Sequence, residues 1–578
     1  MTMQKKFSKK SRGAAGSALV LTMVLGAIAL AILASVMTWS ANSARLTHRS
    51  IQYTRSVAAA EGATEKVVSQ ITHDFLFSGE ARVVANLPTY RQNTVPNATE
   101  STYWNNWVFD DGNGNLGQTH VLRTPGLNYI VLDSTYAGLK AYVSVYTVAA
   151  HARDTANPQE VSGGVLQELQ LAGIPIFQFA MYSAGDMEIS CGQPFDINGR
   201  VHANQTLYVE PDSTLTFQSG VTAVLDILFD RAPQDTRGNP GGGVIYVHPE
   251  QKISPVAALT LPIGTTNTPE AIREIIETPP LGEDPASPLG RLRYYNTSDV
   301  RIVISDTAYR ATAGGLNIAT NDLPLFVSTD KSFFDARENK TVQPVDLNIS
   351  NLNAWVTTNA VLRGALGGAT MNSVYIVDNR TLPGNNLNAV RVVNGAELPP
   401  NGLTVATARP LYVLGNYNQT NVANLGTANT SGTRPASLVA DAVTILSGNW
   451  SDANSTLDVS SRFAAPTTVN AALLTGVVET TPGKYSGGME NFPRFLETWG
   501  GGNAFTYNGS MVKMFPSLYA TNTWGSPNVY TPPARRWAYD LNFDDPLKLP
   551  PKTPSLLKVF RNRWATVPPG TNSLAVTP

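Results

Sequence analysis

The chain has 578 residues, a formal net charge of −1 and a charged fraction of 15%. A near-neutral chain argues against a nucleic-acid partner, because such a protein needs a basic face to neutralise phosphates. The charged fraction lies well below the ~25% of an ordinary soluble domain, which favours an exported, β-rich protein. The single cysteine, Cys191, excludes an intrachain disulfide and a cysteine-rich zinc site, and we expect it to be a small buried side chain.

The amino-terminal end carries a basic tail followed by an apolar run. Residues 1–15 contain five Lys or Arg and no acid, and the run from Ala18 to Met37 contains no charge. As a helix, this run would be about 30 Å long, the thickness of the hydrocarbon core of a bilayer. The apolar part of a cleaved signal peptide is usually only ~7–15 residues. We therefore predict one retained membrane span, with the basic tail in the cytoplasm and the rest of the chain outside.

The same helix is predicted to continue well beyond the membrane. Residues 38–77 contain no Pro, and Ser78-Gly79 is the first strong stop. We expect one helix over residues 17–77, about 90 Å long, whose second half packs on a soluble domain. Its imperfect apolar stripe consists of Leu46, Ile51, Val57, Ala58, Val67, Val68 and Ile71.

The segments RGAAGSALVLTMVL and AAAEGATEKV resemble the PilX-type amino-terminal region of minor pilins and pseudopilin-like proteins. This resemblance implies that residues 1–16 are a leader peptide. A prepilin peptidase would then cut between Gly16 and Ser17 and leave the apolar helix on the mature protein. Gly13 before Ala14 is a second candidate cleavage point.

At one position this chain differs from the major pilins, the bulk subunits of type IV pilus fibres. Major pilins carry Glu at the fifth mature position, where the carboxylate can pair with the amino terminus of a neighbouring subunit. Counted from Ser17, that position is Leu21 in this chain. A buried carboxylate is costly without a partner, so its absence suits a subunit placed without that contact. The departure favours a minor component or a simple anchor over a bulk fibre subunit.

The remaining residues divide into four predicted segments. Residues 78–175 form a small α/β or β domain, in which residues 129–152 are two strands across a turn. Residues 176–265 have short apolar triplets every 8 to 12 residues, separated by Gly, Asn, Asp and Pro. This pattern suggests a sandwich or a solenoid, and irregular turn lengths favour the coils of a parallel β-helix. Residues 266–290 are a helix and a Pro-rich connector, and residues 291–578 are the main β-solenoid with an aromatic-rich cap.

Two further observations support a solenoid. The segment at 314–327 matches the segment at 401–413, as a repeated supersecondary unit would. Blocks between residues 176 and about 555, such as FQFAMYSAGDMEI and SLVADAVTILSGNW, resemble large bacterial proteins of uncharacterised family. Those proteins join a PilX-type amino terminus to a β-helical ectodomain, and the resemblance implies no known activity.

No catalytic motif appears, and we predict no enzyme activity, no metal and no cofactor. His202 is interpreted as a solvated or turn-bonded residue, with a site on an outward solenoid face as the alternative. Residues 110–115, DDGNGN, are interpreted as a surface turn, with a calcium loop as the alternative. The carboxy-terminal aromatic segments are expected to cap the core, with NFPRFLETW as a short helix or turn. The acids Asp540, Asp544, Asp545 and Glu497 form a catalytic set only if the fold brings them together.

The sequence thus favours a structural function. We predict a PilX-like minor pilin or pseudopilin-like subunit of a type IV pilus or type II secretion-like assembly, anchored in the bacterial inner membrane. Its ectodomain would lie in the periplasm or at the cell surface. The expected partners are other pilin-like subunits and the prepilin peptidase. The alternative is a membrane-anchored β-helical adhesin or carbohydrate-active protein that binds surface polysaccharide.

Overall fold

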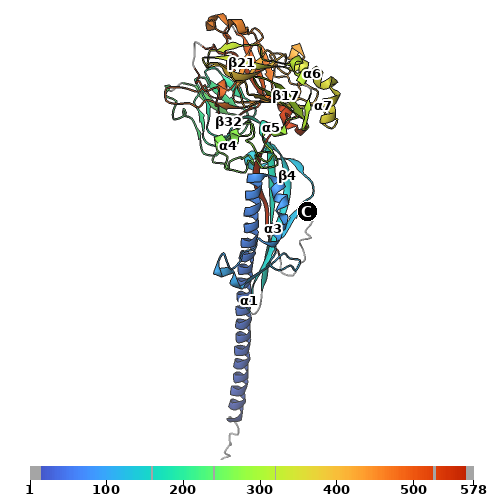
Figure 1. Cartoon of the computed structure of the whole chain (residues 1–578). Coiled ribbons are helices and arrows are strands. Elements are labelled where there is room, and N and C mark those ends of the chain that lie inside the picture. The colour runs from blue at the N-terminus through green and yellow to red at the C-terminus, as the bar shows by residue number, and fades with distance from the viewer. Residues whose placement is uncertain are drawn as a thin grey trace, which may run out of the picture.

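The computed structural model describes residues 15–157, 161–238, 241–318, 320–500, 502–524 and 529–567. Figure 1 shows a long amino-terminal helix as a rod, strands lying along its upper part, and a large β-rich body at its far end. The chain is therefore mainly β with one long helix, as the sequence predicts.

Helix α1 (Ala15–Ser78) runs without a break, in agreement with the predicted helix over 17–77. Gly79 follows it with a φ of 76°, a backbone conformation that glycine adopts at no steric cost. At a rise of 1.5 Å per residue the helix is about 96 Å long. Two short helices come next, α2 (Glu80–Ala85) and α3 (Leu87–Gln92).

The second half of α1 packs on a sheet, and the first half does not. Val67, Val68 and Ile71 are buried in one apolar cluster that also contains side chains of the sheet. The predicted stripe was wrong at three positions, because Leu46, Ile51 and Ala58 are exposed. The sheet begins to cover the helix only from about residue 52 onward, so an apolar stripe in sequence did not locate the edge of the packed region.

The sheet under α1 is antiparallel and is built from both ends of the chain. Strands β4 (Lys140–Asp154) and β5 (Ser162–Pro175) form its centre. Three short strands pair with the other edge of β4, namely β1 (Trp107–Asp110), β2 (His120–Arg123) and β3 (Asn128–Val131). Strand β34 (Ser555–Val567) pairs with β5 along its whole length. We call residues 52–175 together with β34 the head.

The position of β34 corrects the predicted domain division. The sequence placed residues 291–578 in one solenoid with an aromatic cap. In the structure, Ser555 lies opposite Pro175 and Val567 lies opposite Gly164, so the chain returns to the head after residue 554. Residues 568–578 lie outside the described residues. The residues between β5 and β34 therefore form an insertion in the head, which we call the inserted domain.

The first part of the inserted domain consists of short strands in parallel ladders. Leu207 pairs with Met187 on one side and with Ile227 on the other, a spacing of 20 residues each time. Such ladders require each turn of chain to stack on the one before it. The strands are β6 (Phe179–Ser183), β7 (Met187–Ile189), β8 (Phe195–Ile197), β9 (Arg200–Ala203), β10 (Leu207–Val209), β11 (Thr214–Phe217), β12 (Val221–Ala223), β13 (Ile227–Leu228), β14 (Gly243–Tyr246) and β15 (Lys252–Ile253).

The second part is larger and also mostly parallel. It begins after two short helices, α4 (Pro269–Arg273) and α5 (Tyr294–Thr297). One sheet contains β16 (Val300–Ile304), β17 (Tyr309–Ala313), β18 (Leu316–Ile318), β22 (Ser373–Asp378), β24 (Leu403–Ala406), β26 (Ala436–Ala440), β29 (Ala472–Val477) and β32 (Met511–Pro516). A second sheet contains β19 (Val327–Ser328), β20 (Phe333–Asp335), β21 (Lys340–Asn348), β23 (Leu387–Val393), β25 (Leu411–Leu414), β27 (Val443–Leu446) and β30 (Arg494–Phe495). A third contains β28 (Thr467–Asn470), β31 (Ala504–Gly509) and β33 (Ala534–Tyr539). Helices α6 (Ile349–Thr358) and α7 (Ala360–Ala365) interrupt this part.

The two parts share one sheet, although the sequence separates them. Strand β32 pairs in parallel with β6, with Met511 opposite Met181. The order across this sheet is β15-β12-β9-β6-β32-β29-β26-β24-β22-β16-β17-β18. The chain therefore enters the inserted domain in the middle of the sheet, runs to one end, crosses to the other end and returns to the middle. The first strand of this sheet along the chain, β6, and the last, β32, are therefore neighbours in its middle.

The predicted internal repeat does not correspond to one structural unit. In the first copy, β18 pairs antiparallel with β17. In the second copy, β24 pairs in parallel with β22 and β26. The predicted helix in the connector is present as α4, and the side chain of Thr268 accepts a hydrogen bond from the Ala271 amide at its start. The segment NFPRFLETW contains strand β30, which pairs with β27, in place of the predicted helix or turn.

Candidate functional site

The first candidate site is the apolar half of α1. Gly16 and Ser17 lie in its first turn, and residues 1–14 of the predicted leader lie outside the described residues. From Ala18 to Met37 every side chain is exposed, with Leu21 exposed to 61%. Cleavage after Gly16 stays a prediction.

This half of α1 could cross a membrane by its length and composition. After Arg12 the next charged residue in the chain is Arg45. Trp39 stands just beyond the apolar run and is 73% exposed, where an amphipathic ring can lie at the level of lipid headgroups. A large exposed apolar surface on a single helix is unfavourable in water, so this surface requires lipid or protein around it. The structure is consistent with a single-pass anchor.

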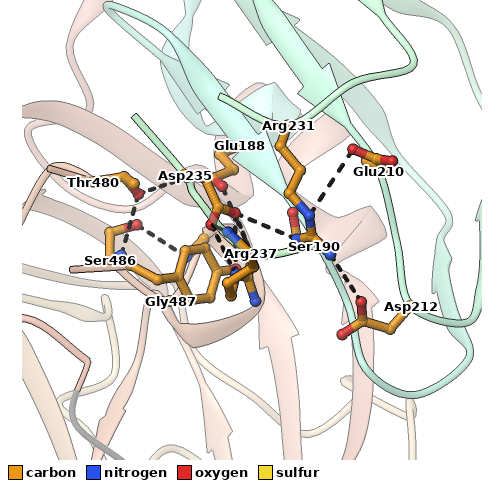
Figure 2. A network of polar contacts seen from close by, with 12 residues as sticks. Glu188, Ser190, Glu210, Asp212, Arg231, Asp235, Arg237, Thr480, Ser486 and Gly487 are labelled. Atoms are coloured by element: carbon orange, nitrogen blue, oxygen red, sulfur yellow. Dashed lines mark hydrogen bonds and ion pairs between the residues drawn. The ribbon is translucent and has the colours of Figure 1, made fainter. Parts of the chain in front are cut away.

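The second candidate site is a buried polar network in the inserted domain. Figure 2 shows Arg231 reaching three carboxylates. Its guanidinium lies 3.1 Å from Asp212, 3.3 Å from Asp235 and 3.9 Å from Glu210. Arg231 belongs to the loop at residues 230–238, whose Pro and Gly content gives it no strand pairing. These ion pairs fix the loop against the ladders of the first part.

A second arginine of the same loop completes the network. Arg237 lies 2.7 Å from Asp235, and its guanidinium stacks over the ring of Tyr485 at 3.3 Å from the centroid. The Tyr485 hydroxyl donates to Glu490 at 2.6 Å, and the Ser190 amide donates to the same carboxylate at 3.2 Å. Burial raises the pKa of Glu490. The network therefore joins the first part of the inserted domain to the segment after β29.

Glu188, on β7, is one of two carboxylates of this network, with Glu210, that have a buried oxygen without a hydrogen-bond partner among the described residues. Its Oε2 accepts a hydrogen bond from the Thr480 hydroxyl at 2.8 Å, whereas its Oε1 is buried without a hydrogen-bond partner among the described residues. Arg237 Nη2 lies 4.0 Å from that oxygen. Burial raises the pKa of Glu188 to about 7, against the lowering effect of the Thr480 bond, and the charges of Glu490 and Asp235 raise it further.

A cavity of about 340 Å³ adjoins the network. It lies between the first ladders and the segment after β29, with Glu188, Tyr208, Arg337, Phe492 and Lys513 in its walls. Arg337 is buried and its pKa is lowered to about 9 by that burial and by repulsion from a neighbouring arginine. The walls thus carry both signs of charge, and most of these groups already have partners within the protein. We interpret the network as a structural connection between the two parts.

Replacing Glu188 with Gln is expected to change how stability depends on pH. The pKa of Glu188 rises from 4.5 to about 7 on folding, so the folded state holds a proton that the unfolded chain has lost between these pH values. The free energy of unfolding of the native chain should therefore fall as pH rises through this window. Glu188→Gln should remove the part of that fall that comes from Glu188, leaving the part from Glu497, whose pKa is also raised to about 7, and should be more stable at pH 8 by up to about 3 kcal/mol. Urea unfolding of both chains at pH 5 and pH 8 measures how the free energy of unfolding changes with pH. An equal change in the native chain and in Glu188→Gln would contradict the prediction.

His202 was predicted as a solvated or turn-bonded residue, or as a site on an outward face. It is fully buried, so the predicted exposure was wrong. Its ring nitrogens lie 2.8 Å from the Thr222 hydroxyl and 3.0 Å from Asn204 Oδ1. Burial lowers the pKa of His202 to about 4, so the ring is neutral at pH 7. It acts as a hydrogen-bonded core residue.

The DDGNGN segment forms a turn around one carboxylate. Asp111 Oδ1 accepts the amides of Asn113 and Asn115, at 2.8 and 3.1 Å. Among the residues that the structure describes, no group of three or more His, Cys, Asp and Glu side chains could hold a metal ion. The turn interpretation is confirmed by these bonds.

The four carboxy-terminal acids do not share one site. The Glu497 carboxylate accepts a hydrogen bond from the Ser447 hydroxyl. The Asp540 carboxylate accepts one from the Thr430 hydroxyl, and both Asp540 and Thr430 line a separate cavity. Asp544 accepts from the Tyr539 hydroxyl, while Asp545 accepts the Leu547 amide at the start of a short helix. They are separate structural groups. Cys191 is buried as predicted, and burial raises the pKa of its thiol to about 12.

Sequence reasoning missed the Arg231 and Arg237 network. The loop sequence RAPQDTRG shows two arginines and an Asp, which is typical of an exposed loop. Their partners come from β7, the residues just after β10 and residues 480–490, and no short-range pattern relates these segments. Only the pairing of strands in the folded chain brings these segments together.

No protein-family model matches this chain, and no curated protein matches it. Among solved structures, the crystal structure of the competence-associated pilin ComZ from Thermus thermophilus matches 89% of this chain and 97% of its own length. The two chains are 10% identical, and the TM-score is 0.28. A TM-score this low does not establish a shared fold, so we base the function on the residues of this chain.

Proposed function

We propose that this chain is a membrane-anchored, pilin-like subunit that displays a β-solenoid domain outside the bacterial inner membrane. The observation that carries the proposal is the division of α1. Its first half exposes an uncharged apolar surface, and its second half is buried on the head sheet. One rigid helix thus joins a membrane-competent segment directly to a folded head.

The apolar half of α1 offers a surface for other helices of the same kind. If residues 18–37 packed against the helices of neighbouring subunits, this apolar surface would be covered by their side chains and no longer contact water or lipid. The run holds Gly26 and several Ala residues, and small residues let helices approach closely. We propose that other pilin-like subunits are the partners of this surface, in a type IV pilus or a type II secretion-like assembly.

Leu21 supports a minor subunit over a bulk fibre subunit. It occupies the fifth position counted from Ser17 and carries no carboxylate. In apolar surroundings a carboxylate at this place would need a cationic partner. A PilX-like minor pilin or pseudopilin has no carboxylate at this position, so it needs no cationic partner there.

The solenoid part of the proposal is supported by the parallel ladders. Strands β7, β10 and β13 stack at a constant spacing of 20 residues, and β8, β11 and β14 form a second ladder beside them. Strands β28, β31 and β33 form a third parallel ladder in the second part. Sequential stacking of this kind buries each turn on its neighbour.

Processing by a prepilin peptidase is expected to leave Ser17 as the first residue of the mature protein. Mass spectrometry of the amino terminus, from cells with and without that peptidase, tests this directly. The proposal predicts a terminus at Ser17 only when the peptidase is present. An intact Met1 in both strains, or cleavage near Ala44 by the general signal peptidase, would leave a passive anchor or a secreted protein.

A further inference from the structure

A small surface pocket lies at one end of the second sheet and shares no lining residue with the cavity beside the Arg231 network. Its volume is about 240 Å³, and we call it the Trp450 pocket. Trp450, Phe463, Arg462 and Glu497 line it, together with the polar side chains Asn449, Ser451, Asn454 and Ser461. These residues come from three stretches of chain that follow β27, precede β28 and follow β30.

Parallel pairing brings the floor of the pocket together. Ile445 on β27 lies opposite Phe495 on β30, so Ser447 and Glu497 each stand two residues beyond a paired position. The Glu497 carboxylate accepts the Ser447 hydroxyl at 2.7 Å and the Ser447 amide at 2.6 Å. Glu497 is 1% exposed, and burial raises its pKa to about 7. Near neutral pH this carboxyl can therefore both accept and donate a hydrogen bond.

A buried cation stands beside this carboxyl without pairing to it. Arg462 is 5% exposed and donates to the carbonyls of Ser455 at 3.3 Å and Val529 at 3.0 Å. Its Nε has no hydrogen-bond partner among the described residues. The charges of Asp335, Asp458 and Glu497 act on Arg462, but none of these carboxylates forms an ion pair with it among those residues. A buried guanidinium that is not neutralised by a carboxylate points to a ligand that can accept hydrogen bonds.

The rim of the pocket is aromatic and polar at once. Phe463 is 65% exposed, a high value for a phenyl ring in a folded domain. Trp450 is held in place by a bond from its indole nitrogen to Asp452 at 2.9 Å and by edge contact with Phe333. Asn449 and Asn454 are exposed beside these rings. The rings offer an apolar surface, and the amides and hydroxyls offer donors and acceptors around it.

We infer that the Trp450 pocket binds one sugar ring of a glycan. A pyranose has an apolar C–H face that can lie on Phe463 or Trp450, and a hydroxyl edge. Its hydroxyls can accept from Arg462 and donate to Glu497, which are not bonded to each other. The volume lies below the ~300 Å³ of typical drug-sized sites, so it suits a single ring and not an extended chain. This inference goes beyond the pilin-like function and does not depend on it.

The test uses the full chain in lauryl dimethylamine oxide, because detergents with sugar headgroups would compete. The probe is an array of immobilised neutral hexosides, N-acetylhexosaminides and uronides, followed by titration calorimetry with the saccharide that binds best. Phe463→Ala is expected to weaken binding about tenfold, and Asn454→Ala is expected to weaken it as well. Both side chains are exposed, so neither variant should lose its fold.

Phe229→Ala is the matched control, because Phe229 is 62% exposed and lies outside the pocket. Its affinity should equal that of the native chain. In Glu497→Gln, the saccharide binding constant should be the same at pH 6 and pH 8. Absence of binding to every saccharide of the array at millimolar concentration would overturn the inference, as would native affinity in Phe463→Ala. Neither result would alter the amino terminus, which tests the pilin-like function separately.

Discussion

A chain that ends at Pro554 is expected to lose its folded head, although the cut lies almost four hundred residues from β5 in sequence. Strand β34 pairs with β5 from Ser555 opposite Pro175 to Val567 opposite Gly164. Its removal exposes the backbone edge of β5 and deletes Leu556, which is fully buried. A domain is usually stable by only ~5–15 kcal/mol, so the loss of a whole paired strand is expected to unfold the head.

Limited trypsin digestion of the full chain and the truncated chain, followed by mass spectrometry, measures the effect. Cleavage after Arg123 and Arg153 in the head should become fast in the truncated chain. Sites in the inserted domain should stay protected, because β6 and β32 pair with each other. Trp564→Ala is the control on the same strand, since Trp564 is 50% exposed. A head that resists trypsin without β34 would contradict the prediction and show that the head folds without its pairing to β34.

Replacing Asp441 with Ala is expected to cost the inserted domain about 3–5 kcal/mol. Asp441 follows β26 and is fully buried. Its carboxylate lies 2.8 Å from the Arg273 guanidinium and accepts the amides of Leu518, Tyr519 and Ala520 at 2.7, 3.1 and 2.9 Å. Alanine would leave the three amides without this acceptor, and the buried Arg273 would keep Glu277, at 2.9 Å, as its remaining carboxylate partner.

Urea unfolding followed by circular dichroism compares Asp441→Ala with the native chain. Asp441→Asn keeps the size of the side chain and should lose less, because its amide oxygen can still accept some of these bonds. Asp330→Ala is the control, since Asp330 is exposed and its ion pair is with the neighbouring exposed Lys331. Its unfolding midpoint should be unchanged. An Asp441→Ala midpoint equal to the native one would mean that α4 is not held by this carboxylate.

Some parts of the fold were open to prediction because their cause is local. Helix α1 follows from an unbroken stretch without Pro, ended by Gly79. The Thr268 cap and the turn around Asp111 depend on side chains within a few residues of the backbone that they bind. The short parallel strands of the first part were foreseen from apolar triplets at regular spacing.

Other parts depended on contacts that no local pattern records. The burial of His202 required the neighbouring turn to place Thr222 against its ring. The Trp450 pocket required β27 and β30 to pair, so that Ser447 meets Glu497 fifty residues later in the chain. The return of β34 to β5 spans the whole inserted domain.

The sequence by itself determined that α1 has an exposed apolar part and a packed part, without the residue at which packing begins, and it determined the mainly β character of the rest. Hydrophobic periodicity and helix-breaking residues act over a few turns, so they are visible without a fold. Only the tertiary structure decided that the β-rich body is an insertion, where its network and pocket lie, and that the carboxy-terminal strand belongs to the head. These outcomes depend on which strand edges find partners, and strand pairing joins residues at any distance along the chain.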